Sequence, residues 1–117
     1  MRSLLIVDDH VGFRTWARTV LTDEGFDVVG EAFDGASAVD AVRDLQPQVV
    51  LLDIQLPDMS GFEVAERIAT GAAVVLTSSR DAADYGQAIE RSSAIGFMPK
   101  AELTGAAIEA LLATGRA

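Results

Sequence analysis

Short apolar runs alternate with amphipathic stretches along the whole chain. The runs are bounded by polar or turn residues and consist mostly of valine, leucine and isoleucine. They cover residues 4–7, 28–29, 49–52 and 74–76 and, less clearly, 95–98. Such runs are typical of strands buried on both faces of a sheet. The pattern therefore predicts five strands.

Between these runs, apolar side chains recur at helical spacing. The expected stripes are Phe13, Trp16, Ala17, Val20 and Leu21; Ala38, Val42 and Leu45; Val64, Ala65, Ile68 and Ala69; Tyr85, Ala88 and Ile89; and Ile108, Leu111 and Leu112. Strands that alternate with helices form right-handed βαβ units. We therefore predict one doubly wound α/β domain over residues 1–117, with a parallel sheet covered on both sides.

The composition is globular and acidic, with 50% hydrophobic residues and a formal net charge of −9. This charge disfavours direct binding to nucleic acid or anionic membranes. The chain has no cysteine, which excludes disulfides and thiolate metal sites. Its apolar start is too short for a signal peptide or a membrane span, so we expect a cytoplasmic protein.

Reactive side chains follow the predicted strands at the point where each strand ends. They are Asp8 and Asp9 after the first strand, Asp53 after the third, Thr77 and Ser78 after the fourth, and Lys100, the only lysine, after the fifth. Parallel strands end on one edge, where α/β proteins bind ligands. Two carboxylates 4 Å apart repel by roughly 4 kcal/mol at an effective dielectric near 20, so the group needs cations. Oxygen ligands suit Mg²⁺ or Mn²⁺.

A divalent ion and an ammonium group beside a carboxylate and a hydroxyl form a receptor for a phosphoryl group. Asp53 is then the nucleophile that becomes an aspartyl phosphate. Ordinary structural roles compete with this interpretation: Asp8 or Asp9 could cap a helix, and Ser78 could be a satisfied core hydroxyl. The combination favours the phosphoryl site. We expect His10 to be exposed beside the helix start, without a chemical role.

These motifs resemble the receiver domain of bacterial two-component response regulators over essentially the full chain. The most specific stretch is residues 53–61, Asp-Ile-Gln-Leu-Pro-Asp-Met-Ser-Gly, supported by residues 6–9 and 96–100. Residues 8–14 are similar to receivers of the NarL/FixJ type. The resemblance implies a CheY-like, flavodoxin-like fold with five strands in the order 2-1-3-4-5.

The resemblance also implies roles at the metal and phosphoryl site. Asp53 would be phosphorylated, Asp9 would ligate the metal directly, and Asp8 would do so largely through water. The backbone carbonyl of Gln55 would be a further ligand. Lys100 would contact the phosphoryl oxygens.

By the same resemblance, further residues would take part in the conformational switch and set the rate at which the phosphoryl group is lost. Phe97 would occupy the aromatic switch position, and Gln55 and Arg80 would modulate hydrolysis of the aspartyl phosphate. The switch hydroxyl is either Thr77, by its local sequence, or Ser78, by its separation from Lys100. Strand alternation lets only one of them face the site, and we favour Ser78.

We therefore expect a signalling domain that catalyses only its own phosphorylation and dephosphorylation. Its phosphodonor would be a sensor histidine kinase, a phosphotransfer protein or a small phosphodonor. Phosphorylation would alter a surface within residues 81–114, formed by the fourth helix, the fifth strand and the fifth helix. That surface would bind an effector, a fused output domain or a second copy of the chain. A stand-alone receiver and the N-terminal part of a longer transcriptional regulator both remain open.

Three rival functions are less well supported. A haloacid-dehalogenase-like phosphatase needs an Asp-x-Asp-x-Thr strand end, which neither residues 8–12 nor 53–57 provide. A flavodoxin-like cofactor binder needs a phosphate loop where this chain has two aspartates. A degenerate receiver that serves only as a scaffold would not need the full set of acidic, hydroxyl and lysine side chains.

Overall fold

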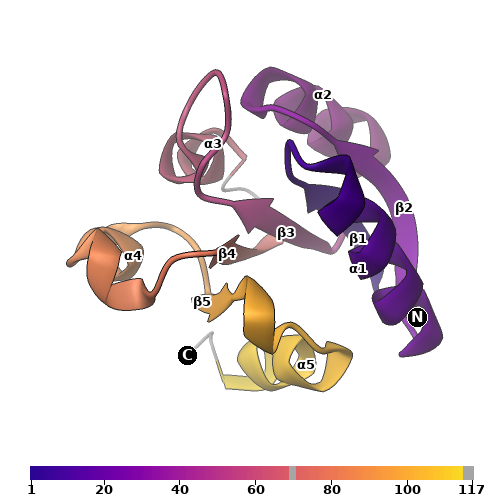
Figure 1. Ribbon diagram of the computed structural model, residues 1–117. Helices are drawn as coiled ribbons and strands as arrows, with labels where there is room; N and C mark the ends of the chain where they lie inside the picture. Colours follow the sequence, from indigo (N-terminus) through magenta and orange to yellow (C-terminus); the bar gives the residue numbers. More distant parts are fainter. Residues whose placement is uncertain (69–70, 115–117) are drawn as a thin grey trace.

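The computed structural model describes residues 1–68 and 71–114. Within them, five parallel strands form one sheet in the order β2-β1-β3-β4-β5. The strands are β1 (Ser3–Val7), β2 (Asp27–Ala32), β3 (Val49–Asp53), β4 (Ala73–Ser78) and β5 (Gly96–Pro99). The predicted doubly wound fold and its strand order are confirmed (Figure 1).

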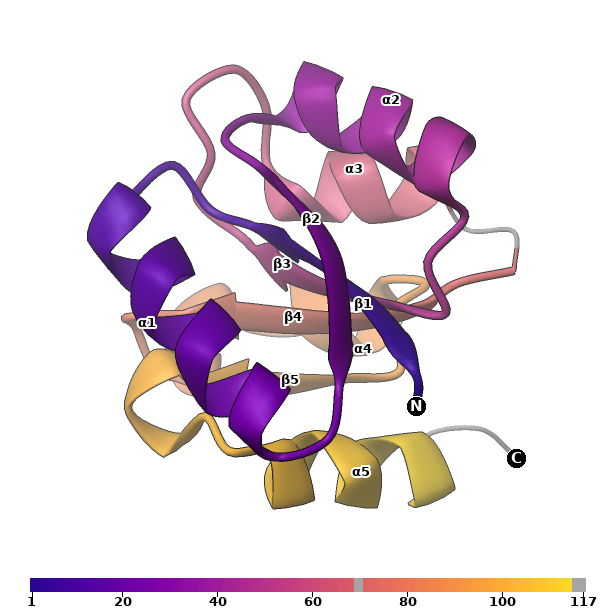
Figure 2. The ribbon, with the colours of Figure 1, turned by 90° about the vertical axis from the view of Figure 1, so that its right-hand side faces the viewer.

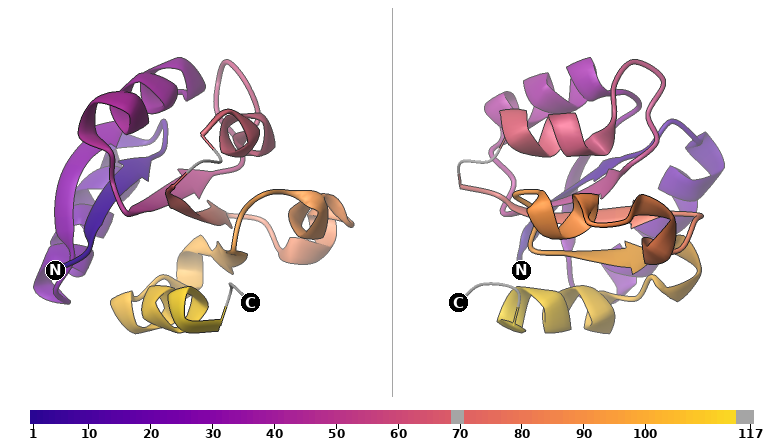
Figure 3. Two further views of the ribbon diagram at one scale, coloured as in Figure 1. Left: turned by 180° about the vertical axis from the view of Figure 1, so that it is seen from behind. Right: turned by 90° about the vertical axis from the view of Figure 1, so that its left-hand side faces the viewer.

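Helices cover both faces of the sheet. They are α1 (Val11–Asp23), α2 (Gly35–Leu45), α3 (Gly61–Arg67), α4 (Ala88–Arg91) and α5 (Gly105–Thr114), with 3-10 turns η1 (Ala82–Tyr85) and η2 (Lys100–Glu102). Helices α2 and α3 lie on one side of the sheet and α1 and α5 on the other (Figure 2). The short α4 lies between α3 and α5, beside β4 and β5 (Figure 3).

Side-chain alternation along the central strands divides the core into two parts. Leu5, Leu52 and Leu76 pack towards α2 and α3, and they are fully buried. Their neighbours Ile6 and Leu51 pack towards α1 and α5 and are equally buried. Burying one such side chain contributes about 1.5–3 kcal/mol, so the central strands are held firmly from both sides. Their C-terminal ends are thereby fixed relative to one another.

Three details differ from the sequence-based expectation. Trp16 and Leu45 are 47% and 45% exposed, because their helical stripes are wider than the face that the sheet covers. Strand β2 is not buried on both faces, since it is an edge strand in which only Ala32 is buried. Tyr85 belongs to η1, and Gly86, with φ +57°, separates it from α4. The predicted helical position Ala69 lies outside the described residues.

None of the helices in the described ranges has both the length and the apolar character that a membrane span requires.

Candidate functional site

The ends of three strands bring two carboxylates and the lysine together, as the sequence predicts. Asp8 directly follows β1, Asp53 is the last residue of β3, and Lys100 directly follows β5. The Nζ of Lys100 lies 2.5 Å from Oδ2 of Asp8 and 3.3 Å from Oδ2 of Asp53. Both aspartates are buried, with exposed fractions of 0% and 3%. A charged cluster therefore lies at the edge of the sheet, largely shielded from water.

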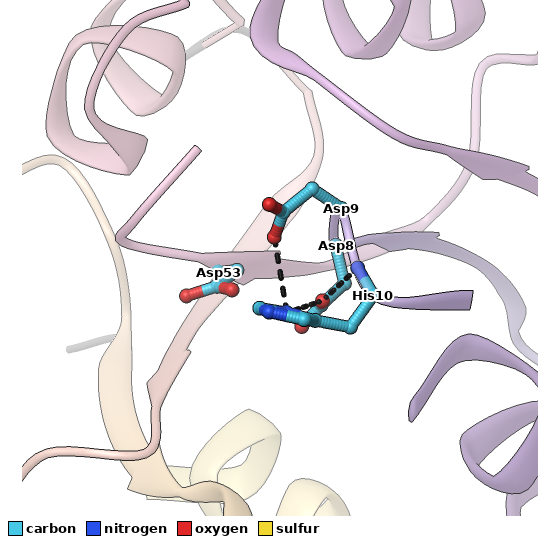
Figure 4. Close-up of side chains that lie close together, drawn as sticks. All are labelled: Asp8, Asp9, His10 and Asp53. Carbon is cyan, nitrogen blue, oxygen red and sulfur yellow. Dashed lines mark hydrogen bonds and ion pairs between the residues drawn. The ribbon is translucent and has the colours of Figure 1, made fainter. Parts of the chain in front are cut away.

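Asp9 and His10 complete a cluster of possible metal ligands. One ligand atom from each of Asp8, Asp9, His10 and Asp53 lies within 4.8 Å of the others (Figure 4). The Nδ1 atom of His10 is 3.0 Å from Oδ1 of Asp8 and 3.1 Å from Oδ1 of Asp9. The ring is exposed, as expected, but its place between two carboxylates was missed. The signal available in the sequence was the turn-forming Asp8, whose Oδ1 also accepts the His10 backbone N–H at 2.8 Å.

Neither acidic residue of the 8–9 pair caps α1, because the N-cap position belongs to His10. Helix capping, the structural role that competed with metal binding at Asp8 and Asp9, is therefore not what these residues do. Within the described residues, Oδ2 of Asp8 is buried without a geometrically acceptable hydrogen bond, and its close contact is the Lys100 ammonium. A buried carboxylate oxygen beside further carboxylates fits a hard divalent cation.

The electrostatics distinguish the two buried aspartates. Burial and the neighbouring charge of Asp8 raise the pKa of Asp53 to about 6, against the lowering effect of the Gln55 N–H and Lys100. Burial also acts to raise the pKa of Asp8, but Lys100 and the His10 N–H outweigh it and leave that pKa below its ordinary value. Burial acts to lower the pKa of Lys100, but the two carboxylates raise it overall. The lysine is thus held charged. Of the two aspartates, Asp53 is the one at which hydrogen bonds and the lysine do not offset the cost of burying its charge.

The two hydroxyls at the end of β4 have different partners. Both residues are completely buried. Oγ1 of Thr77 donates to the backbone oxygen of Met98 at 2.7 Å and so ties β4 to the edge strand β5. Oγ of Ser78 lies 2.6 Å from the hydroxyl of Tyr85 and accepts the Arg80 N–H at 3.0 Å. Thr77 is committed to holding two strands together, whereas Ser78 is bonded to the segment that follows β4.

The other predicted residues lie around this edge. Phe97, on β5, is half-buried, and its ring centroid is 6.1 Å from that of Tyr85. The backbone N–H of Gln55 donates to Oδ1 of Asp53 at 3.0 Å, and its side chain is exposed. Arg80 is also exposed. Their placement is compatible with the expected roles, which stay predictions.

The loop after Asp53 needs a glycine for a steric reason. Gly61 donates its N–H to the oxygen of Ile54 at 2.7 Å and begins α3. A Cβ at this position would lie 2.5 Å from the backbone oxygen of Asp53, which is too close for any side chain. The loop therefore returns against the backbone of the phosphoacceptor candidate and fixes it.

Two further side chains, Arg14 and Asp58, hold the backbone around the site. Nη1 of Arg14 donates to the backbone oxygen of Asp8 at 2.6 Å, while its Nε donates to Glu31 at 3.0 Å. The carboxylate of Asp58 accepts the N–H of Gly35 at 2.7 Å and so joins the loop after β3 to the start of α2. Sequence reasoning gave these two residues no such task, because their partners Glu31 and Gly35 lie 17 and 23 positions away along the chain and only the fold brings them together.

Comparisons with known proteins agree with this geometry. The sequence profile of the response regulator receiver domain matches residues 4–112. The chain is 37% identical to a protein-glutamate methylesterase/protein-glutamine glutaminase of Paramagnetospirillum magneticum, over 89% of this chain and 30% of that protein. It is 40% identical to the DNA-binding response regulator MtrA of Mycolicibacterium paratuberculosis, over 74% of this chain and 40% of that protein.

Among solved structures, the signal receiver domain of the response regulator NarL from Mycobacterium tuberculosis is similar throughout. It superimposes with a TM-score of 0.81 at 32% identity, covering 95% of this chain and 96% of that one. The first curated relatives are much longer than the aligned region, which spans 20% to 51% of their length. The similarity therefore concerns one region of those proteins.

Proposed function

Because this chain belongs to the response regulator receiver domain family of two-component systems, we propose that it accepts a phosphoryl group on Asp53 and thereby switches a protein-binding surface. The observation that carries the proposal is the position of Lys100, whose ammonium group lies 3.3 Å from the buried carboxylate of Asp53. A phosphoryl group attached to that carboxylate would be next to a fixed positive charge.

In the proposed reaction, a carboxylate oxygen of Asp53 attacks the phosphorus atom of the donor. A new O–P bond forms while the bond from phosphorus to the leaving group breaks, and the leaving group takes the electron pair. The leaving group is an imidazole nitrogen if the donor is a kinase phosphohistidine, and acetate if it is acetyl phosphate. With its pKa near 6, Asp53 is mostly ionised at neutral pH and is available as the nucleophile.

The residues around Asp53 position the groups and balance their charge. The Gln55 N–H fixes Oδ1, and Lys100 faces Oδ2. Asp8, Asp9 and Asp53 would hold the divalent cation, with the Gln55 carbonyl as a further ligand. A bound Mg²⁺ or Mn²⁺ would neutralise the charge that develops on the transferred oxygens. Without it, the acidic cluster would repel the donor.

The added group would then change the surface. A phosphoryl group brings roughly one to two negative charges and three acceptor oxygens. Ser78 would turn to donate to it, and Phe97 would pack into the space that Ser78 leaves. The change would spread through η1, α4, β5 and α5. This surface would bind an effector protein, an output domain of a longer chain or a second copy, and a sensor histidine kinase or phosphotransfer protein would supply the phosphoryl group.

Intact-mass analysis after incubation with acetyl phosphate and Mg²⁺ tests the proposal. Wild type and the control Asp40→Asn, which alters a solvent-exposed acidic residue on α2 away from the cluster, should each gain one phosphoryl mass. Asp53→Asn should gain none. A wild-type protein that gains no mass, or an Asp53→Asn variant that gains it equally, would overturn the proposal.

A further inference from the structure

The proposed switch residue is already bonded in the resting structure, and its partner is Tyr85. The Ser78 and Tyr85 hydroxyl oxygens are 2.6 Å apart, a short distance for a hydrogen bond between hydroxyls. The Arg80 N–H donates to the same Ser78 oxygen at 3.0 Å. Because Ser78 is fully buried, water cannot take the place of Tyr85, so breaking the bond is costly unless another group bonds the Ser78 hydroxyl.

Tyr85 is held where it can act on Ser78 and still move. Its ring lies between Phe62, at 5.9 Å and edge-on, and Phe97, at 6.1 Å, measured between centroids. It is the last residue of η1, and Gly86, at φ +57°, separates it from α4. The ring also borders a surface hollow of about 620 Å³ between α3 and α4. Tyr85 therefore contacts both the hydroxyl and the aromatic residue that the proposed function assigns to the switch.

We propose that Tyr85 is a positioning residue for the switch hydroxyl, bonding Ser78 in the resting state and releasing it when Asp53 is phosphorylated. The inference rests on the proposed function, since the phosphoryl group replaces the phenol as the hydrogen-bond partner of Ser78. Release of Tyr85 frees its ring from Ser78 while it still touches Phe97. The two aromatic side chains therefore move together, and η1 and α4 move with them.

The hydrogen bond between Ser78 and Tyr85 disfavours the phosphorylated state, because that state forms only after the bond is lost. Removing the phenol oxygen while keeping the ring should therefore favour the phosphorylated arrangement. A typical hydrogen bond of this kind changes an equilibrium by roughly 2- to 12-fold. Tyr85→Phe should bind beryllofluoride, in the presence of Mg²⁺, more tightly than wild type by about this factor. A merely structural tyrosine would give the opposite result, because its loss would weaken the site.

Tyr85 is the only tyrosine in the chain, so protein labelled with ¹³Cζ-tyrosine has one resonance that reports this hydroxyl. Without phosphodonor, that resonance should differ between wild type and Ser78→Ala. Equal resonances would show that the resting bond does not exist. After acetyl phosphate and Mg²⁺, the wild-type resonance should move towards the Ser78→Ala value. An unmoved resonance in protein whose intact mass shows phosphorylation would overturn the release.

Beryllofluoride affinity provides the second arm, as a double-mutant cycle. Tyr85→Phe should raise the affinity in the wild-type background and have no such effect in the Ser78→Ala background. An equal effect in both backgrounds, or a loss of affinity in Tyr85→Phe, contradicts the inference. Failure of the proposed function is seen separately, as the absence of a mass gain at Asp53. That result would also rule out the release of Tyr85 on phosphorylation. The resting bond would still be tested by the tyrosine resonances of wild type and Ser78→Ala without phosphodonor.

Discussion

The ammonium group of Lys100 lies closer to Oδ2 of Asp8, at 2.5 Å, than to the phosphoacceptor candidate Asp53, at 3.3 Å. The resting lysine therefore balances the buried charge of a metal-ligand candidate. A divalent cation at Asp8 would take over that task and leave the lysine for a phosphoryl group on Asp53. In this arrangement, the metal and the lysine act on the same pair of carboxylates.

Lys100→Met should destabilise the protein by about 3–5 kcal/mol in metal-free buffer, because it leaves the fully buried Asp8 without its cation. Urea denaturation measures the loss, and added Mg²⁺ should recover part of it. Arg43→Met is the matched control, since Arg43 pairs with Asp40 and Asp44 in solvent and should change little. Equal losses of unfolding free energy in the two variants would show that the buried pair of Lys100 and Asp8 contributes no more to stability than an exposed ion pair.

Asp9→Asn should weaken Mg²⁺ binding by roughly tenfold, or about 1.4 kcal/mol, because it removes one charged ligand of the cluster. Stability without metal should hardly change, since the Asp9 side chain is partly exposed and, within the described residues, its one ion-pair contact is with the His10 ring. Calorimetric titration measures the affinity, with the solvent-exposed substitution Asp40→Asn as the control. Unchanged affinity in Asp9→Asn would remove Asp9 from the ligand set.

Asp53→Asn should stabilise the metal-free protein at pH 7.5 by up to about 3 kcal/mol. The folded-state pKa of Asp53, about 6, lies above the unfolded value of 3.8. Its contribution to stability is therefore fully present below pH 3.8 and is lost as the pH rises through 6. The advantage of the variant should accordingly shrink to zero in acid.

Urea midpoints at several pH values in chelator test this dependence. Asp58→Asn is the control of opposite sign, because the Gly35 N–H holds the pKa of Asp58 below its ordinary value. Its contribution is present at neutral pH and is lost as the pH falls, so this variant should be less stable at neutral pH and approach wild type in acid. An Asp53→Asn variant that is destabilised at pH 7.5 would contradict the prediction.

Thr77→Val and Ser78→Ala should separate structure from switching. Thr77→Val loses the bond to the Met98 oxygen and should cost about 1–3 kcal/mol, while its amide NMR shifts still respond to beryllofluoride. Ser78→Ala should cost less, because Ser78 is bonded to the partly exposed Tyr85 rather than to a neighbouring strand, but the response of residues 81–114 should be lost. The reverse pattern would make Thr77 the switch residue.

Gly61→Ala should destabilise the fold by about 1–3 kcal/mol, since its Cβ would meet the backbone of Asp53 and Ile54 at 2.5 and 2.7 Å. Gly12→Ala is the control, because this helical glycine has nothing within 4 Å of its Cβ position and should gain roughly 0.5–1 kcal/mol. Denaturation midpoints distinguish the two directions. Neutral behaviour of Gly61→Ala would show that the loop can move away at no cost.

Hydrophobic patterning was enough to predict the alternation of strands and helices and the edge of the sheet at which the reactive side chains gather. Buried strands need apolar side chains on both faces, and parallel connections place every strand end on one edge, so residues 4–7 and 49–52 already locate Asp8 and Asp53. The family also follows from local motifs, and the profile match confirms it.

Which of these groups contact one another could not be predicted before the chain was seen folded. The sequence left Thr77 and Ser78 as alternatives, because a hydroxyl's partner depends on the neighbouring strand and the following turn. Likewise, the exposure of Trp16 depends on how much of α1 the sheet covers. The bond between Ser78 and Tyr85 depends on where η1 ends. Hydrophobic periodicity places a residue on an element, whereas hydrogen bonds between distant segments are decided within about an ångström by packing.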